Sequence, residues 1–349
     1  MTTKMLKWVL CAGAVAMLGA CDDGNGTMDA GPGGEDAGTG TDGGPAQLGD
    51  LNVVLEAEDT ITEGLVPGST GETIQDGWAV TFQDYITVIG DIDVHLATDE
   101  TVEAEAGDTF AVDMVAVPES GLTLWTLDGL ATGRWQFNYA IAGAGDGAMR
   151  HESVTEAQFS EMQTNDWTYL IAGTLTQTGG QSCPPAALAV PGSATANGNT
   201  NSGGDACYHQ DTISFRFGIQ AETAFGPCEI DEMPGFAVTA GSSTTVAATL
   251  HGDHIFFNGF PEGDEGGVMR LAQWLADCDL NLDGEVTREE LEMIAPSDLP
   301  EIDTRYQLGG SPITPLNEMW DYVTAQVKTQ GHFQGEGECP FDGMAHDHD

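Results

Sequence analysis

The sequence predicts a mainly β fold, an antiparallel β-sandwich followed by a C-terminal helical segment. Apolar and polar residues alternate with period two in several short segments between residues 49 and 260, which is the pattern of strands that bury one face. Gly, Pro, Asp and Asn separate these segments, and such spacing is typical of a sandwich rather than of a parallel α/β sheet. A stretch of this length can bury a core of its own, so one β domain suffices.

The first 20 residues are expected to be a lipoprotein signal peptide. Lys4 and Lys7 precede an apolar run from Trp8 to Ala20, which is too short to span a membrane and ends in small residues. The ending LGAC resembles a bacterial lipobox, and the resemblance implies that Cys21 carries a lipid. We therefore expect an extracytoplasmic protein of the bacterial cell envelope, periplasmic or at the cell surface. The lipid on Cys21 would anchor it to a membrane.

Residues 21–48 are expected to form a disordered tether. They are rich in Gly, Asp and Thr and have almost no apolar side chains, so they cannot bury enough surface to offset the entropy of ordering.

Alternation predicts the strands of the β domain, residues 49–260. The clearest case is residues 134–142, in which the aromatic and aliphatic side chains fall on one face. The expected strands are residues 52–58, 78–89, 91–96, 109–117, 134–142, 167–176, 211–222 and 244–250. One helix, residues 155–164, is expected to interrupt them.

Residues 261–349 are expected to form a helical tail. Its last helix is predicted at residues 315–329, with Thr314 as N-cap and a proline at the first helical position. This helix carries one apolar face, made by Leu316, Met319, Trp320, Val323 and Val327.

Residues 279–290, DLNLDGEVTREE, place oxygen-bearing side chains at alternate positions of a twelve-residue loop. These side chains belong to Asp279, Asn281, Asp283, Thr287 and Glu290. A glycine at the sixth position permits the sharp turn, and Glu285 at the seventh offers its backbone carbonyl. Because a calcium ion needs six to eight oxygens, this spacing predicts a Ca²⁺ site.

The stretch 267–295 resembles an EF-hand, a helix-loop-helix motif, because apolar residues also flank the loop at the expected offsets. They are Leu271, Trp274, Leu275, Cys278, Leu291 and Ile294. The resemblance implies calcium as cofactor, with Glu290 contributing both carboxylate oxygens. EF-hands usually come in pairs, and the sequence offers no second loop. We expect the 315–329 helix, or a face of the sandwich, to cover the apolar surface in its place.

Histidines suggest an alternative, a copper or zinc site. His251, Asp253 and His254 come together at the end of a predicted strand, and His332 follows the last predicted helix. Residues three apart on a straight strand point to opposite faces, so His251 and His254 converge only if the residues between them turn. If they do, all four side chains are candidate ligands for a transition metal. His346 and His348 form a second, terminal candidate.

The cysteines indicate an oxidising compartment. After the signal peptide and Cys21 are set aside, five remain, and the EF-hand resemblance places Cys278 on an apolar helix face as a free thiol. The other four allow three pairings. We favour Cys183–Cys207, which closes a Gly/Asn-rich loop, and Cys228–Cys339, which attaches the tail to the sandwich.

Charge and motifs limit the remaining function classes. The chain has 9 basic and 56 acidic residues, a net charge of −47, which excludes nucleic acid as a partner and favours divalent cations. No nucleophile elbow, phosphate loop or dinucleotide fingerprint occurs, so a non-enzymatic calcium-binding lipoprotein is the leading interpretation. A secreted hydrolase acting on polysaccharide remains an alternative, and a protein or glycan partner of the β domain is left open.

Overall fold

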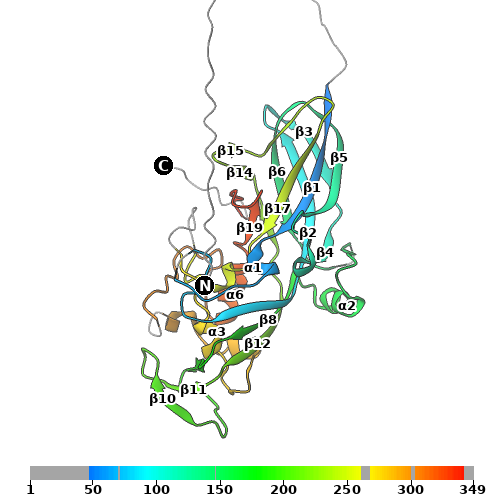
Figure 1. Ribbon diagram of the computed structural model, residues 1–349. Helices are drawn as coiled ribbons and strands as arrows, with labels where there is room; N and C mark the ends of the chain where they lie inside the picture. The colour runs from blue at the N-terminus through cyan, green and yellow to red at the C-terminus, as the bar shows by residue number, and fades with distance from the viewer. Residues whose placement is uncertain (1–46, 70, 146, 261–267, 300–302, 342–349) are drawn as a thin grey trace, which may run out of the picture. The chain divides into compact units, whose positions relative to one another are not determined.

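In the structure, a computed structural model, strands are more common than helices, and the helices are short (Figure 1). The structure describes residues 47–69, 71–145, 147–260, 268–299 and 303–341. The predicted signal peptide, Cys21, nearly all of the predicted tether and the terminal histidines lie outside these residues. The described residues belong to one compact unit. The predicted mainly β, sandwich-like fold class is confirmed.

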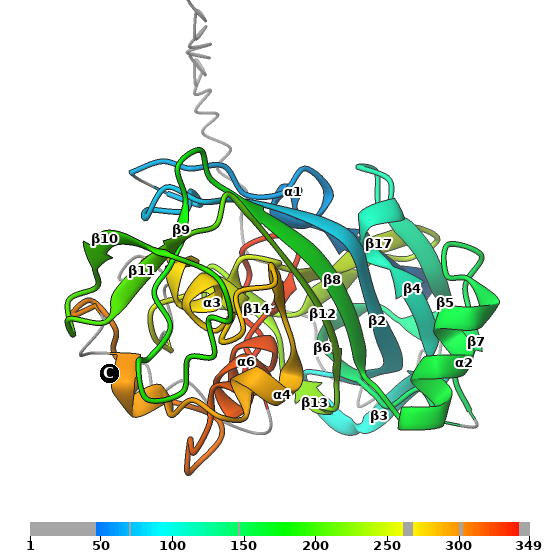
Figure 2. The same ribbon diagram turned by 90° about the horizontal axis from the view of Figure 1, so that it is seen from below.

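The largest sheet is organised around β2 (Ala79–Leu96), the longest strand. The first half of β2 pairs antiparallel with β8 (Tyr169–Thr176), and its second half with β6 (Gly133–Ile141). On the far side of β8 lies β12 (Thr212–Ile219), so that β2, β8 and β12 run side by side (Figure 2). Shorter strands extend this sheet: β3 (Asp99–Ala106), β4 (Phe110–Asp113), β7 (Met149–Arg150), β13 (Thr223–Phe225), β16 (Phe236–Val238) and β18 (Glu285–Val286).

The strands predicted at 78–89 and 91–96 are a single strand. Its register against β6 shifts between Gly90 and Asp93, and Asp91 has a φ of 50°. The break predicted near residue 90 is therefore a bulge-like irregularity within β2, which bends the strand without ending it.

A second sheet has the strand order β19, β17, β1, β5. Here β1 (Leu48–Ala57) pairs antiparallel with β5 (Leu122–Ala131) but parallel with β17 (Ser243–Leu250), to which β19 (Gly331–Phe333) adds antiparallel. The pairs β4–β7 and β12–β18 are also parallel. Most strand pairs are antiparallel, as predicted, and these three parallel pairs were not foreseen. Long connections, which parallel neighbours require, separate these strands in sequence.

Two small sheets complete the strands. One contains β9 (Gln181–Ser182), β10 (Ala196–Thr200) and β11 (Ala206–His209), and the other contains β14 (Glu229–Ile230) and β15 (Met233–Pro234).

The helices are shorter than predicted, except α2. They are α1 (Asp59–Thr62), α2 (Glu156–Asn165), α3 (Gln273–Asp277), α4 (Arg288–Leu291) and α6 (Met319–Val327), with 3₁₀ turns η1 (Met114–Ala116), η2 (His254–Phe256) and η4 (Pro296–Asp298). The predicted N-cap Thr314 is wrong. The last helix starts after Glu318, which forms a capping box with Asp321: the Asp321 carboxylate accepts from the Glu318 backbone N–H at 3.4 Å, and the Glu318 side chain accepts from the Asp321 backbone N–H.

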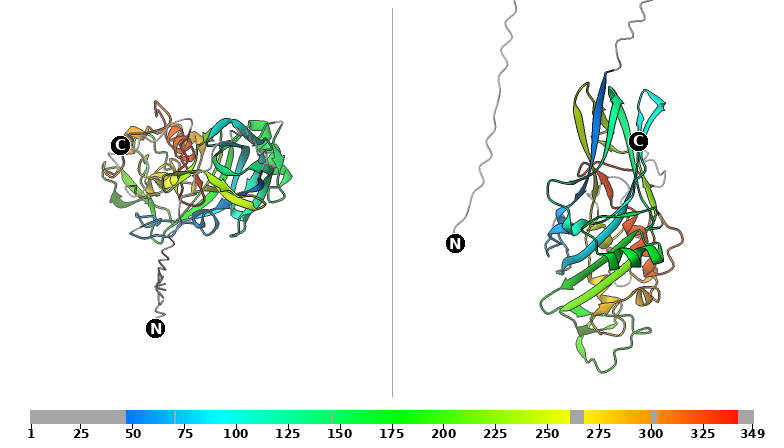
Figure 3. Two further views of the ribbon diagram at one scale, coloured as in Figure 1. Left: turned by 90° about the horizontal axis from the view of Figure 1, so that it is seen from above. Right: turned by 90° about the vertical axis from the view of Figure 1, so that its right-hand side faces the viewer.

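One hydrophobic core joins the sheets to the tail. In β6 the alternating side chains Trp135, Phe137, Tyr139 and Ile141 are all buried, as predicted. The tail contributes Leu275, Met319 and Val323 to the same core. Figure 3 shows the tail, in orange and red, alongside the green strands of the large sheet, and the Trp320 ring lies 5.7 Å from that of Phe217. The tail is thus part of the β domain.

Two disulfides cross-link the chain, Cys183–Cys207 and Cys228–Cys339, which are the pairings that the sequence favours, and Cys278 is a buried free thiol. They indicate a non-cytoplasmic environment. Among the described residues, no helix has the length and apolar character needed to cross a membrane.

Replacing Cys228 and Cys339 by alanine should lower the free energy of unfolding by about 2–5 kcal/mol, because this disulfide closes a long loop. Cys183→Ala/Cys207→Ala is the matched control. Its cysteines are 24 residues apart rather than 111, so its loss should cost roughly 1 kcal/mol less. Urea unfolding of both variants measures the two effects. An equal or smaller loss for the Cys228/Cys339 variant would contradict this account of how the tail is held.

Candidate metal centre

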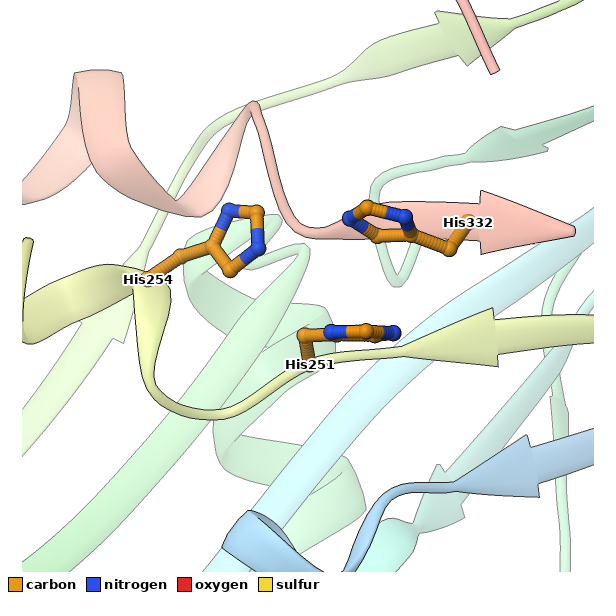
Figure 4. Close-up of side chains that lie close together, drawn as sticks. All are labelled: His251, His254 and His332. Atoms are coloured by element: carbon orange, nitrogen blue, oxygen red, sulfur yellow. The ribbon is translucent and has the colours of Figure 1, made fainter. Parts of the chain in front are cut away.

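Three histidines converge where the tail strand meets the second sheet (Figure 4). His251 follows the last residue of β17, His254 opens η2, and His332 is the central residue of β19. In the β17–β19 ladder His332 lies opposite Thr249. Side chains two apart on a strand share a face, so His251 lies next to His332. The tail thus supplies one of the three imidazoles.

The turn predicted between His251 and His254 is present. Gly252 and Asp253 form a bend that leads directly into η2. A Cβ atom at Gly252 would lie 2.5 Å from Cγ1 of Ile61, so only glycine allows the chain to turn this close to α1. The turn directs His254 back toward the other two rings.

The three rings form a compact cluster. The ring centroids of His251 and His332 are 3.9 Å apart and nearly parallel, and His254 is roughly perpendicular to both, at 5.7 and 5.3 Å. One ligating nitrogen of each ring lies within 4.8 Å of those of the other two. His251 and His254 are buried and His332 is half-buried. This geometry allows one ion to contact all three imidazoles.

The hydrogen bonds of His254 determine which of its nitrogens can bind a metal. The Thr329 hydroxyl donates to the Gln326 carbonyl at 2.8 Å, and Nδ1 of His254 lies 2.9 Å from the same hydroxyl oxygen. Because a hydroxyl has one proton, Thr329 must accept from Nδ1–H. In the neutral ring the lone pair is then on Nε2, the arrangement usual for a metal-binding imidazole with a partner on its other nitrogen.

His251 is oriented from two sides. Its Nε2 lies 3.2 Å from the Gly335 carbonyl oxygen, and its Nδ1 lies 3.3 Å from Oε2 of Glu58. A carbonyl can only accept, so Nε2–H donates to Gly335. Nδ1 is then the ligating atom, and it faces the Glu58 carboxylate.

Glu58 was not predicted from the sequence. It follows β1 as His251 follows β17, and the parallel pairing of Ala57 with Leu250 brings the two strand ends together. Burial raises the pKa of the Glu58 carboxyl to about 7, an effect that nearby Asp253 reinforces and that His251 and a hydrogen bond from Thr60 oppose. No sequence signal distinguishes Glu58 from the many other acidic residues.

Asp253 has a partner that was not predicted. Its side chain is fully buried, and its Oδ2 accepts a charge-assisted hydrogen bond from Nε of Arg270. It approaches Glu58 and His251 within 4.8 Å, but it is not part of the three-histidine cluster. The guanidinium of Arg270 also covers the Phe257 ring at 4.9 Å. Asp253 is therefore grouped with His251 and Glu58 rather than with all three histidines, and its role as a metal ligand stays a prediction.

In the predicted calcium loop, two carboxylates form hydrogen bonds with backbone N–H groups of the same loop. The Asp279 carboxylate accepts hydrogen bonds from the backbone N–H groups of Asp283 and Gly284, and the Glu290 carboxylate from those of Leu280 and Asn281. Gly284 has a φ of +86°, as the sixth position requires. Both carboxylates therefore face the loop interior. Burial, together with the charges of Glu290 and Asp283, raises the pKa of Asp279 to about 6, although the backbone hydrogen bonds from Gly284 and Asp283 oppose the rise.

Two features differ from the expected calcium motif. The flanking helices α3 and α4 have only five and four residues. Thr287 also points its hydroxyl to Glu290, at 2.8 Å. In the described part of the chain, the clusters of three ligating side chains within 4.8 Å do not include the loop carboxylates. A bound cation would have to draw these carboxylates closer together.

The large sheet and α6 together cover the segment that resembles an EF-hand. Val286, at loop position eight, pairs with Phe215 of β12. At the other side of the motif, the Met319 N–H of α6 donates to the Ile294 carbonyl at 2.8 Å. Leu271, Leu275 and Ile294 are buried as a result. Both elements named as possible covers in the sequence analysis therefore contribute.

Comparison with known protein-family models, curated proteins and solved structures finds no match for this chain. The function therefore has to be inferred from the geometry of the two sites.

Arg270→Met should lower the free energy of unfolding by about 3–5 kcal/mol, because it leaves the Asp253 carboxylate buried without its cationic partner. Arg305→Met is the matched control. Arg305 pairs with Asp303 near the surface, where such pairs contribute about 0–1 kcal/mol. Chemical denaturation compares the two variants. Equal losses would mean that the buried pair does not support the turn.

Proposed function

We propose that this protein is an extracytoplasmic metal-binding protein whose three-histidine cluster holds a copper or zinc ion. The observation that carries the proposal is the convergence within 4.8 Å of His251, which follows β17, His254 on η2 and His332 on β19. Imidazole nitrogens suit copper and zinc better than calcium or magnesium, which prefer oxygen.

The surroundings of the cluster support this proposal. Thr329 holds His254, and Gly335 holds His251, through the nitrogens that face away from the cluster. Such partners fix the orientation of metal-binding imidazoles. Three imidazoles also leave a coordination position for water, a substrate or the neighbouring Glu58 carboxylate. The arrangement suits binding or delivery of an ion without requiring catalysis.

The sequence supports a location in the bacterial cell envelope. The LGAC segment favours a lipid on Cys21, and the tether would let the folded part stand away from the membrane. A metal-binding role fits this location, because ions are exchanged there between the surroundings and the cell.

The alternative of a polysaccharide hydrolase gains little support. An acidic cleft near the cluster is lined by six carboxylates, yet none of its lining residues is aromatic.

The metal proposal is tested by titrating the full chain with Cu²⁺ and Zn²⁺ in a calorimeter and counting bound ions. We expect one ion per chain, and a loss of affinity of about 100-fold or more in His254→Ala or His332→Ala, since even losing an orienting partner costs 10–100-fold. His95→Ala is the control, because His95 pairs with Asp93 on β2. Unchanged binding in the cluster variants, or no binding by the unaltered chain, would refute the proposal.

A second candidate function is calcium binding by residues 279–290, through Asp279, Asn281, Asp283, Glu285, Thr287 and Glu290. The inward-facing carboxylates of Asp279 and Glu290 favour it. We propose that this ion is structural, since a site of about 10⁻⁴–10⁻³ M affinity stays loaded at extracellular calcium levels.

Calcium should raise the unfolding temperature of the unaltered chain, because a ligand that binds only the folded state stabilises it. Glu290→Gln should abolish this rise, since Glu290 would provide both oxygens that close the site. Glu292→Gln is the control: Glu292 is on the same segment but pairs with Arg288. Differential scanning calorimetry with and without Ca²⁺ measures both variants. A rise that persists in Glu290→Gln would place the calcium site elsewhere.

A further inference from the structure

A cleft of about 520 Å³ opens next to the three-histidine cluster. Its floor includes Thr249, which lies opposite His332, and Gly335, whose carbonyl contacts His251. Six carboxylates line it, and no basic side chain is among its lining residues. The acidic ones are Glu56, Glu58, Asp59, Glu63, Glu72 and Glu119.

Three groups of metal-ligating side chains follow one another from this cleft to the histidines. The outer group is Glu58, Glu72 and Glu336, of which Glu72 and Glu336 are exposed. The middle group is Glu58, His251 and Asp253, and the inner group is the histidine cluster. Glu58 belongs to the first two groups and His251 to the last two. Within each group the ligating atoms lie within 4.8 Å of one another, so a cation could pass inward without losing all its ligands.

The middle group gives evidence that does not depend on surface charge. Asp253 is fully buried, and its Oδ1 has no hydrogen-bond partner among the described residues, although Oδ2 accepts from Arg270. A buried carboxylate oxygen without a partner is costly. A cation between Glu58 and His251 would satisfy it.

The order of ligand types gives the path a direction. Carboxylates at the entrance bind hydrated divalent ions with little discrimination, whereas imidazoles favour copper and zinc over calcium and magnesium. A transition-metal ion therefore gains affinity as carboxylates give way to imidazoles. Calcium and magnesium ions gain no affinity from imidazole ligands, so they would return to solvent.

We propose that the acidic cleft is the entry path through which a divalent transition-metal ion reaches the histidine cluster, with Glu58 and His251 as the shared ligands along it. This inference rests on the proposed metal-binding function and adds the route and the rate of loading. Clefts lined by one sign of charge raise the association rate of oppositely charged ligands by about 10–1,000-fold.

The test is the rate of Cu²⁺ uptake by the full chain, followed by stopped-flow absorbance at low ionic strength. Glu72→Gln/Glu336→Gln removes two exposed carboxylates of the outer group and should slow association by about tenfold or more, with the difference shrinking as salt is added. The spectrum of the bound ion and the one-to-one stoichiometry should match those of the unaltered chain.

Glu103→Gln/Glu105→Gln is the matched control. It removes the same charge from exposed positions on β3, outside the cleft, and should leave the rate within about twofold of the unaltered chain, since distant surface charges are screened. If both double variants slow uptake equally, or neither does, the entry path is refuted while the histidine site stands. If the unaltered chain takes up no Cu²⁺, or His254→Ala binds as tightly as it does, the proposed function itself fails.

Discussion

The hydrogen bonds between β19 and β17 are the interaction on which the candidate metal centre depends. Three residues of the tail, Gly331–Phe333, pair with the last three residues of β17. This ladder sets His332 beside His251, and the Tyr139 hydroxyl strengthens it by donating to the His332 carbonyl at 3.1 Å. The disulfide Cys228–Cys339 fixes the tail a few residues further on. Without this return of the chain, the cluster would lack its third imidazole.

One helix joins the two candidate ion sites. The start of α6 contacts the EF-hand-like segment twice. The Met319 N–H donates to the Ile294 carbonyl, and the guanidinium of Arg288 lies 4.7 Å from the Trp320 ring centroid. Just past its end, Thr329 accepts from His254. The helix is buried along most of its length. The candidate calcium loop and the histidine cluster therefore both pack against the same helix.

Alternation predicted the strands whose one face is buried, such as β6 and β12, because their inward side chains are uniformly apolar. It missed β3, whose residues DETVEAEA are largely exposed and acidic, so that no apolar face marks the strand. The parallel pairing of β1 with β17 was also missed, since pairing partners far apart in sequence leave no local pattern. The same cause hid Glu58. Its place beside His251 comes from that pairing and not from its neighbours in sequence.

For the histidines, sequence reasoning identified the three rings and the condition under which they meet. It could not foresee that Arg270 pairs with Asp253, because these two residues meet only in the folded chain. The helix boundaries of the tail failed for a related reason. Short segments held by tertiary contacts need little intrinsic helix stability, so propensity overstated their length.

The residues of the metal centre come from almost the whole length of the folded unit, from Glu58 at the end of β1 to His332 on the last described strand. In an unfolded chain, only His251 and His254 are close together, because His332 is far from both in sequence. Under the proposed function, an ion could therefore contact all three imidazoles only after β19 has paired with β17. If this happens on the far side of a membrane, the metal content of that compartment, rather than the metal pool of the cytoplasm, decides which ion the protein acquires first.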